Sequence, residues 1–132
     1  MCKGGFFVMD LKEKTIILKK HTDELKNRYE SHEPPENRKD RDFFQMVKTE
    51  TSPIYDLLAQ WEEETLAVVK TKNINLHPHQ VTSTRENLEL LLMHSYLIDA
   101  RRKRYMELNH SVQYIFDQLV RELDRLHSDA TE

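Results

Sequence analysis

The feature that most constrains this chain is its lack of glycine after the fifth residue. The sequence has 132 residues and two glycines, Gly4 and Gly5, so none occurs from Phe6 to Glu132. Glycine lets a backbone adopt positive φ and approach a ligand closely. Phosphate-binding P-loops, dinucleotide-binding fingerprints and the usual nucleophile elbow depend on it, as do the tight turns of most β-hairpins. The sequence therefore favours a helical protein and argues against these glycine-dependent sites.

Composition and cysteine content narrow the class further. Charged residues make up 33% of the chain and the net charge is only −3, whereas dedicated nucleic-acid binders are strongly basic. The single cysteine, Cys2, cannot form an intramolecular disulfide, which suits a reducing cytoplasm. No apolar run approaches the roughly 20 residues of a membrane span. We expect one cytoplasmic domain with its own core.

Residues 1–8 are predicted to be a translated leader that precedes the native start. Their Lys-Gly-Gly tripeptide can be encoded by a purine-rich, ribosome-binding sequence a few bases ahead of the codon for Met9. Asp10 then follows as a helix N-cap, and Glu13 completes a capping box. The alternative is a genuine N-terminal extension whose two phenylalanines pack on the folded domain. The domain itself is expected to span 9–128, with a tail at 129–132.

Apolar residues at three- and four-residue spacing predict four long helices. Because each helix has one apolar face, the four faces can pack on a common core. The apolar pattern lapses at 99–103, so the turn between the third and fourth helices is expected there. The predicted helices are Leu11 to Tyr29, Ser52-Pro53 to Lys72, His77-Pro78 to Ile98, and Tyr105 to Leu126.

A short extra helix is predicted between the first and second long helices. Prolines 34 and 35 prevent a helix from crossing the polar stretch 31–41. Asp42 can cap a short helix from Phe43 to Lys48, and Ser52 followed by proline has the N-cap and N1 residues of a new helix. The expected fold is an all-α, antiparallel up-and-down four-helix bundle with this short helix between its first two long helices.

Seven histidines raise the question of a metal site in such a bundle. Di-iron bundles use Glu-x-x-His with both ligands in the core, and Glu107-x-x-His110 matches that string. At 100° per residue, however, the core face of this helix is centred near Leu108 and Val112. Glu107 then lies on a flank and His110 almost opposite the core, which favours two solvated side chains.

Three other histidines are the candidate ligands of a metal-binding alternative. His77 and His79 flank Pro78 and could chelate zinc, although this string reads more simply as a helix start. His94 lies on the flank of the third helix, and no other histidine falls on an inward face. No core carboxylate pair, Ser–His pair or Cys–His pair is evident. We therefore predict no catalytic residue, no metal site and no cofactor.

The densest charge in the chain is the basic cluster Arg101-Arg102-Lys103-Arg104. Such a cluster could contact the phosphates of nucleic acid or lipid. The simpler interpretation is a solvated turn, with cations placed favourably at the C-terminus of the third helix. Since acidic residues outnumber basic ones overall, the simpler interpretation is favoured and nucleic acid is an unlikely partner.

A second apolar stripe on the third helix calls for a cover. Leu90, Met93 and Leu97 lie at i, i+3 and i+7, opposite the core stripe. The cover could be the predicted helix 43–48, the leader, or another protein chain, and the helix is favoured. If it does not reach, these residues and the outward Tyr114 form the predicted surface for a protein partner or a homodimer through the third helix.

Several strings resemble one family of small proteins. The order and spacing of these strings resemble the YppE-like family of Gram-positive bacteria, whose members are described as having unknown function. The resemblance covers roughly Asp42 to Leu123 and implies a four-helix bundle, but it carries over no catalytic or ligand residue. The strings are Asp42-Phe43-Phe44, Leu58-Ala59-Gln60-Trp61, Glu86-Asn87-Leu88-Glu89-Leu90, His94-Ser95-Tyr96, Lys103-Arg104-Tyr105 and Ser111-Val112-Gln113-Tyr114.

Taken together, these patterns predict a protein of unknown function that is most simply non-enzymatic. We expect a cytoplasmic helical bundle that acts through protein–protein contacts. The alternative is a metal-binding bundle, or a metal-dependent enzyme, that uses His77, His79 or His94.

Overall fold

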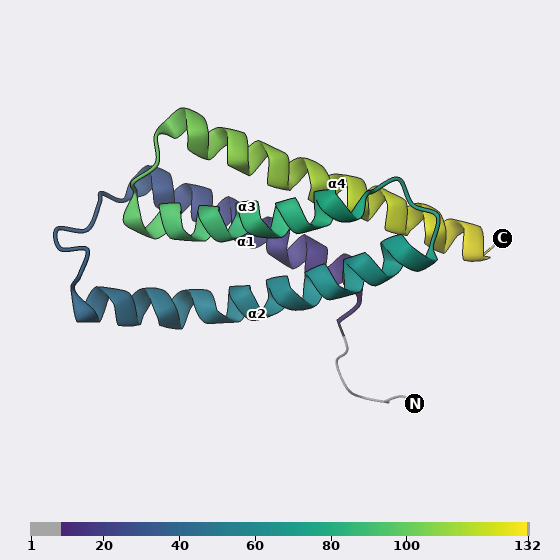
Figure 1. Ribbon diagram of the computed structural model, residues 1–132, viewed down its shortest axis with the longest axis horizontal. Coiled ribbons are helices and arrows are strands. Elements are labelled where there is room, and N and C mark those ends of the chain that lie inside the picture. The colour runs from purple at the N-terminus through teal and green to yellow at the C-terminus, as the bar shows by residue number, and fades with distance from the viewer. Residues whose placement is uncertain (1–8, 132) are drawn as a thin grey trace.

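The protein is a bundle of four long helices that run alternately up and down (Figure 1). The computed structural model describes residues 9–131, with side chains through residue 128. Consecutive helices pack side by side, α4 returns to α1, and α1 also contacts α3 across the diagonal. The predicted all-α four-helix bundle is confirmed. The helices are α1 (Leu11–Ser31), α2 (Arg41–Thr71), α3 (Pro78–Leu97) and α4 (Arg102–Thr131).

The predicted leader, residues 1–8, lies outside the described residues, as do the side chains of the tail. Within the described part of the chain, no helix combines the length and the apolar character needed to cross a membrane.

The start of α1 is confirmed at the residues that the sequence indicated. The Asp10 carboxylate accepts a hydrogen bond from the Glu13 backbone N–H at 2.8 Å, and the Glu13 carboxylate accepts one from the Asp10 N–H at 3.4 Å. Two N–H groups that the first helical turn leaves without partners are thereby satisfied. The helix ends at Ser31, and His32 is already extended, as expected shortly before Pro34.

Replacing Asp10 by alanine is expected to lower the free energy of unfolding by about 1 kcal/mol, because the N-cap acceptor is lost. Urea denaturation followed by circular dichroism measures the change. Asp10→Ser is the matched control, since a serine hydroxyl can accept the same hydrogen bond and should retain most of the stability. Equal losses in both variants would mean that the cap does not stabilise α1.

The predicted short helix is wrong as a separate element. Helix α2 runs without a break from Arg41 to Thr71 and carries Pro53 in its interior. Its N-cap is Asp40 rather than Asp42, and the Asp40 carboxylate accepts the Phe43 N–H at 3.1 Å. Residues 43–48 therefore form the first turns of α2, and the break that we expected before Pro53 does not exist.

The helix continues through Pro53 because its apolar face stays in phase on both sides. Val47 packs against the core and Thr51, Ile54 and Leu58 are buried, so successive inward positions are three or four residues apart. A proline removes one backbone hydrogen bond and crowds the carbonyl four residues earlier. Burial of the continuous face outweighs that local cost. The sequence-based prediction gave too much weight to Pro53 and therefore missed that α2 continues through it.

The core centres on Trp61, which is completely buried. Its indole N–H donates to the Thr15 hydroxyl at 3.0 Å, and its ring meets Phe116 edge-on with centroids 5.2 Å apart. Lys14 is also buried, and it forms an ion pair with Glu64 of α2. These contacts tie α1, α2 and α4 together at the middle of the bundle.

The turn between α3 and α4 is shorter than predicted and begins with an unusual residue. Helix α3 ends at Leu97, and Ile98 adopts the left-handed conformation with φ 51° and ψ 47°. A β-branched residue there costs about 1–2 kcal/mol relative to a right-handed conformation. Glycine is the usual residue at this position, and the described chain has none. Helix α4 already begins at Arg102.

Candidate protein-binding surface

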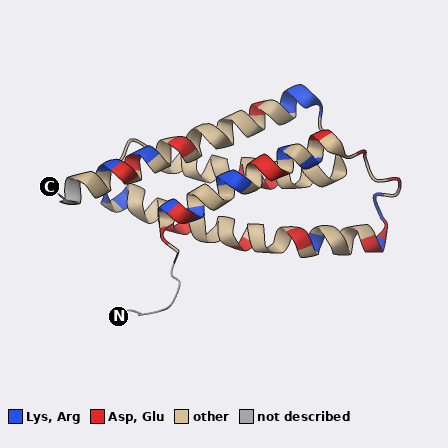
Figure 2. Cartoon of the chain, turned by 180° about the vertical axis from the view of Figure 1, so that it is seen from behind, with Lys and Arg blue, Asp and Glu red and all other residues tan. Residues whose placement is uncertain are grey.

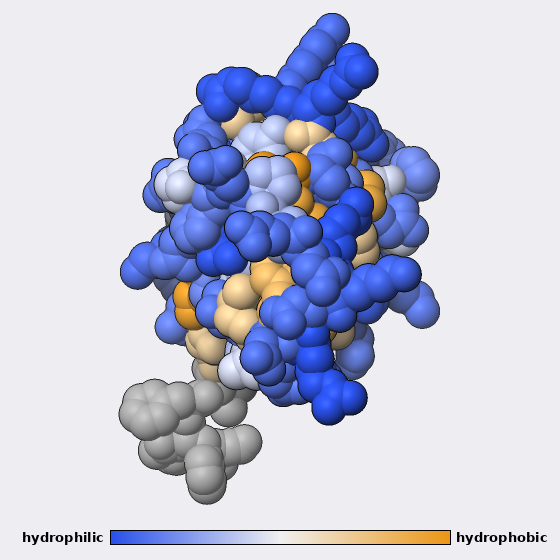
Figure 3. All heavy atoms as spheres, turned by 90° about the vertical axis from the view of Figure 1, so that its left-hand side faces the viewer, coloured by the Kyte–Doolittle hydropathy of each residue, from blue (hydrophilic) through white to orange (hydrophobic). Residues whose placement is uncertain are grey.

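An apolar groove of about 170 Å³ lies between the first half of α2 and the last half of α3. Figure 3 views the molecule from the end where α2 begins in Figure 1. In the lower half of that view, apolar residues gather between hydrophilic side chains. The lining is almost entirely aromatic and aliphatic. It consists of Phe43, Phe44, Val47, Thr51, Tyr55, Leu92, Met93, Tyr96 and Leu97.

The start of α2 flanks the predicted stripe of α3 rather than covering it. Phe43 packs partly against the core, but Phe44 remains 51% exposed. On the opposite wall Met93 is also 51% exposed, and Leu90, which is not among the lining residues, is 37% exposed. Leu97 is half-buried within the groove. Within residues 9–128, the favoured intramolecular cover is therefore incomplete, and part of this apolar surface is exposed.

Tyr114 does not join this surface. It lies on α4 with 60% of its area exposed, outside the lining of the groove. Conversely, sequence reasoning missed Phe44 and Tyr55 as members of the site. On one continuous helix these two residues are eleven positions apart, which places them on the same face. The predicted break in α2 concealed that signal.

Both helices that form the groove carry charged residues, and Figure 2 shows acidic and basic residues together along α2. On the α2 side, Arg41 and Lys48 are exposed. On the α3 side lie Glu86 and Glu89, and Glu89 accepts a hydrogen bond from Arg85 at 3.4 Å. Burial, and then the charge of Glu89, raises the pKa of Tyr55.

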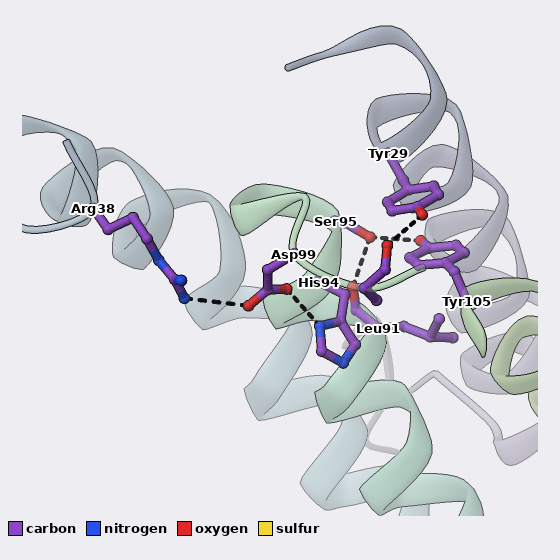
Figure 4. A network of polar contacts seen from close by, with 8 residues as sticks. Tyr29, Arg38, Leu91, His94, Ser95, Asp99 and Tyr105 are labelled. Atoms are coloured by element: carbon purple, nitrogen blue, oxygen red, sulfur yellow. Dashed lines mark hydrogen bonds and ion pairs between the residues drawn. The ribbon is translucent and has the colours of Figure 1, made fainter. Parts of the chain in front are cut away.

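The end of the groove abuts a polar network that holds the α3–α4 turn (Figure 4). Asp99 contacts His94 Nδ1 through one carboxylate oxygen at 2.7 Å and accepts from Arg38 through the other at 3.2 Å. The Tyr29 hydroxyl donates to the Ala100 carbonyl at 2.6 Å. These contacts anchor the turn that follows the left-handed residue Ile98. The side chain of His94 therefore has a structural role in holding this turn.

A second set of contacts, also drawn in Figure 4, connects the same turn to the core. The hydroxyls of Ser95 and Tyr105 are 2.6 Å apart, and Ser95 also donates to the Leu91 carbonyl at 2.6 Å. The Tyr105 ring stacks on Tyr29 with centroids 4.0 Å apart and an interplanar angle of 7°. Three helices, α1, α3 and α4, thus meet at this end of the bundle.

The candidate metal ligands are not brought together. His77 donates its backbone N–H to Gln80 at 2.9 Å, and His79 lies 3.5 Å from the Ser83 hydroxyl. His94 is at the other end of α3, about 22 Å from them at 1.5 Å per residue. Among the described residues, no group of three or more His, Cys, Asp or Glu side chains is arranged to hold a metal ion. The metal-binding alternative is not favoured.

The basic cluster belongs to the first turn of α4, not to the end of α3 as predicted. Residues 102–104 are helical, and the first turn of α4 contains no acidic residue (blue at the start of α4 in Figure 2). Cations are unfavourable at a helix N-terminus. Arg102 is compensated by Glu30 of α1 at 2.6 Å, and this hydrogen bond lowers the pKa of Glu30.

The geometry defines an all-α four-helix-bundle protein whose most distinctive surface is an open apolar groove. The chain belongs to the family described as a bacterial domain of unknown function (DUF1798), whose model matches residues 15–123.

A curated relative agrees with this assignment. The chain is similar to the uncharacterized protein YppE of Bacillus subtilis (strain 168), with 28% identity over 89 residues, which are 64% of this chain and 72% of the relative. The predicted resemblance to the YppE-like family is therefore confirmed.

Solved structures share the fold. The crystal structure of YppE from Bacillus subtilis has a TM-score of 0.79 at 24% identity, with 89% of this chain and 95% of that chain covered. The solution NMR structure of the same protein has a TM-score of 0.75 at 20% identity, with 91% and 97% covered. At these identities the likeness concerns the fold alone.

Proposed function

We propose that this protein is a non-enzymatic cytoplasmic bundle that binds an amphipathic helix of another protein in the groove between α2 and α3. The observation that carries the proposal is the exposure of Phe44 and Met93, which line the same groove and are each 51% exposed. Contiguous apolar side chains cost free energy in water and are typical of surfaces that bind a partner.

The shape of the groove favours a helix as the ligand. Phe44 and Tyr55 on its α2 wall are separated by about 16 Å, which corresponds to three helical turns. An amphipathic helix presents anchors at i, i+3, i+4 and i+7 over that length. An extended peptide would need a free sheet edge, whereas the backbone groups of α2 and α3 are bonded within their own helices. Met93 adds an unbranched, adaptable contact.

Charges near the groove would influence the orientation of that helix. Glu89 acts electrostatically on Tyr55 of the groove, and helical spacing puts Glu86 on the same face of α3, whereas Arg41 and Lys48 are exposed basic residues of α2. A partner with a basic flank toward α3 and an acidic flank toward α2 would complement both rims and associate faster. This pattern distinguishes a specific partner from nonspecific apolar contact.

Site-specific photo-cross-linking in the cells that make this protein tests the proposal. With benzoyl-phenylalanine in place of Met93, we expect one cross-linked protein whose linked peptide is an amphipathic helix. Lys20, exposed on α1, is the control position and should give no such product. The same substitution at Tyr114 tests whether the surface extends onto α4.

The linked segment, made as a peptide, should then bind the wild-type protein and bind Met93→Glu at least tenfold more weakly, because a buried carboxylate has no partner in the groove. Identical products at positions 93 and 20 would refute the proposal. Cross-linking at 93 to a second copy of this chain would replace it with a homodimer.

A further inference from the structure

A second cleft lies between α1 and α2, shares Tyr96 of α3 with the apolar groove, and measures about 320 Å³. Leu25, Ile54 and Tyr96 supply apolar surface to it, and Arg28 and Glu50 supply opposite charges. The remaining lining residues are His21 and Glu24, which pair with each other at 3.1 Å. Because four of the seven lining residues are His, Glu or Arg, a cleft of this size suits a small ligand that carries polar groups beside an apolar part.

Tyr96 holds the two opposite charges apart. The Arg28 guanidinium lies over the Tyr96 ring, 4.1 Å from its centroid, while the Tyr96 hydroxyl donates to the Glu50 carboxylate at 2.7 Å. One charge is therefore above the ring face and the other at the ring edge. No ion pair joins Arg28 and Glu50 in the part of the chain that the structure describes.

Arg28 differs from three arginines that pair with a carboxylate elsewhere in the fold. Arg38, Arg85 and Arg102 each contact a carboxylate of another helix or turn. Arg28 is partly buried, yet within residues 9–128 its Nε has no hydrogen-bond partner and its side chain has no carboxylate partner. A partly desolvated cation without an anion is costly. Stacking on Tyr96 orients this guanidinium but does not neutralise it.

We propose that this cleft binds a small zwitterion, an apolar α-amino acid. Its carboxylate pairs with Arg28 through the planar fork of the guanidinium, and its ammonium group pairs with Glu50. Its side chain packs on Leu25 and Ile54. A simple anion would be repelled by Glu50 and Glu24, and a simple cation by Arg28, so a ligand with both charges complements the cleft better than either ion.

Binding of L-leucine tests this inference, measured by NMR chemical-shift titration of the full chain. We expect saturable shifts around the cleft. N-acetyl-L-leucine lacks the cationic group and L-leucinamide lacks the anionic group, and both should bind at least about tenfold more weakly, as the loss of one charge-assisted hydrogen bond implies.

Variants of Arg28 and Glu50 test which charge of the ligand each residue binds. Arg28→Met and Glu50→Gln should each weaken leucine binding at least about tenfold. Arg104→Met, which removes an exposed arginine at the start of α4, is the matched control and should bind normally. Arg28→Lys keeps the charge but loses the planar fork, so it should bind more weakly than wild type while folding normally. Circular dichroism verifies that each variant is folded.

Three outcomes would overturn the inference. One is the absence of saturable shifts with leucine and phenylalanine up to about 10 mM, where even a millimolar site would be mostly occupied. Another is equal binding of leucine and its two analogues. The third is unchanged leucine binding by folded Arg28→Met. The test does not depend on the helix-binding groove, because Met93→Glu should still bind leucine.

Discussion

Replacing Trp61 by alanine is expected to lower the free energy of unfolding by about 3–5 kcal/mol, the largest effect of any single substitution considered for this protein. Trp61 is completely buried, and its ring contacts Phe116 edge-on at 5.2 Å. Truncation leaves a cavity between helices and removes the hydrogen-bond donor of the buried Thr15 hydroxyl. Urea denaturation followed by far-ultraviolet circular dichroism measures the loss.

Trp61→Phe is the matched control for the Trp61→Ala experiment. It keeps an aromatic ring against Phe116 but lacks the indole N–H, so it should cost about 1–3 kcal/mol, from the lost hydrogen bond and a smaller cavity. Circular dichroism is needed because the chain has one tryptophan and both variants lose its fluorescence. A loss below about 1 kcal/mol for Trp61→Ala would show that the centre of the bundle is not tightly packed.

Stability is expected to fall steeply between about pH 10 and 12, because two buried tyrosines must ionise on unfolding. Burial raises the pKa of Tyr105 to about 12, against a weaker opposing hydrogen bond from Ser95. Burial and then the hydrogen bond to Glu50 raise the pKa of Tyr96 to about 12 as well. Tyr105 is fully buried and Tyr96 is 7% exposed, so solvent screens neither phenol strongly.

The direction of this change in stability follows from the number of protons that the folded and unfolded states bind. Below the ordinary tyrosine pKa of about 10, both states keep the phenol protonated and its contribution to stability is complete. As pH rises from 10 through 12, the unfolded chain loses the proton while the folded protein retains it, so the contribution disappears. The difference between a folded-state pKa of about 12 and the ordinary value of about 10 corresponds to about 2–3 kcal/mol for each tyrosine.

Urea denaturation at about pH 9 and about pH 12 measures this loss. The double variant Tyr96→Phe, Tyr105→Phe should lose much less stability over the same range. Tyr114→Phe, at an exposed position, is the matched control and should behave like wild type. Lysines also titrate in this range, but they affect all variants alike. An identical pH dependence in wild type and the double variant would contradict the prediction.

The helices themselves could be predicted because their determinants are local. The inward residues of α1 repeat every three or four positions, and the structure buries Thr15, Leu18, Thr22 and Leu25. The capping box of Asp10 and Glu13 spans three residues, so the start of α1 was predicted from adjacent chemistry. Local periodicity and local caps are properties that a sequence displays directly.

Pro53 shows where local rules fail. Proline in a helix interior costs about 3 kcal/mol in isolation, and Ser52 before it suggested a new N-cap. Instead, the Ser52 hydroxyl donates to the Lys48 carbonyl within the same helix at 2.7 Å. The apolar face of α2 packs against the core on both sides of the proline, and that burial outweighs the local cost. The groove wall formed by Phe44 and Tyr55 exists only because the helix is continuous.

The two candidate sites also differ in how far the sequence could predict them. The stripe of Leu90, Met93 and Leu97 could be predicted because it lies on one helix. The charge pair of the second cleft could not, because Arg28, Glu50 and Tyr96 come from three helices and meet only when the bundle packs.

By itself, the sequence determined a helical protein without glycine-dependent loops, the periodic faces that form the bundle, and the cap that begins α1. Tertiary structure alone decided the continuity of α2, the left-handed Ile98 in a turn without glycine, and the convergence of charges on Tyr96. The reason is physical. Short-range patterns depend on neighbours along the chain, whereas strain and charge placement are settled by the free energy of packing the whole bundle.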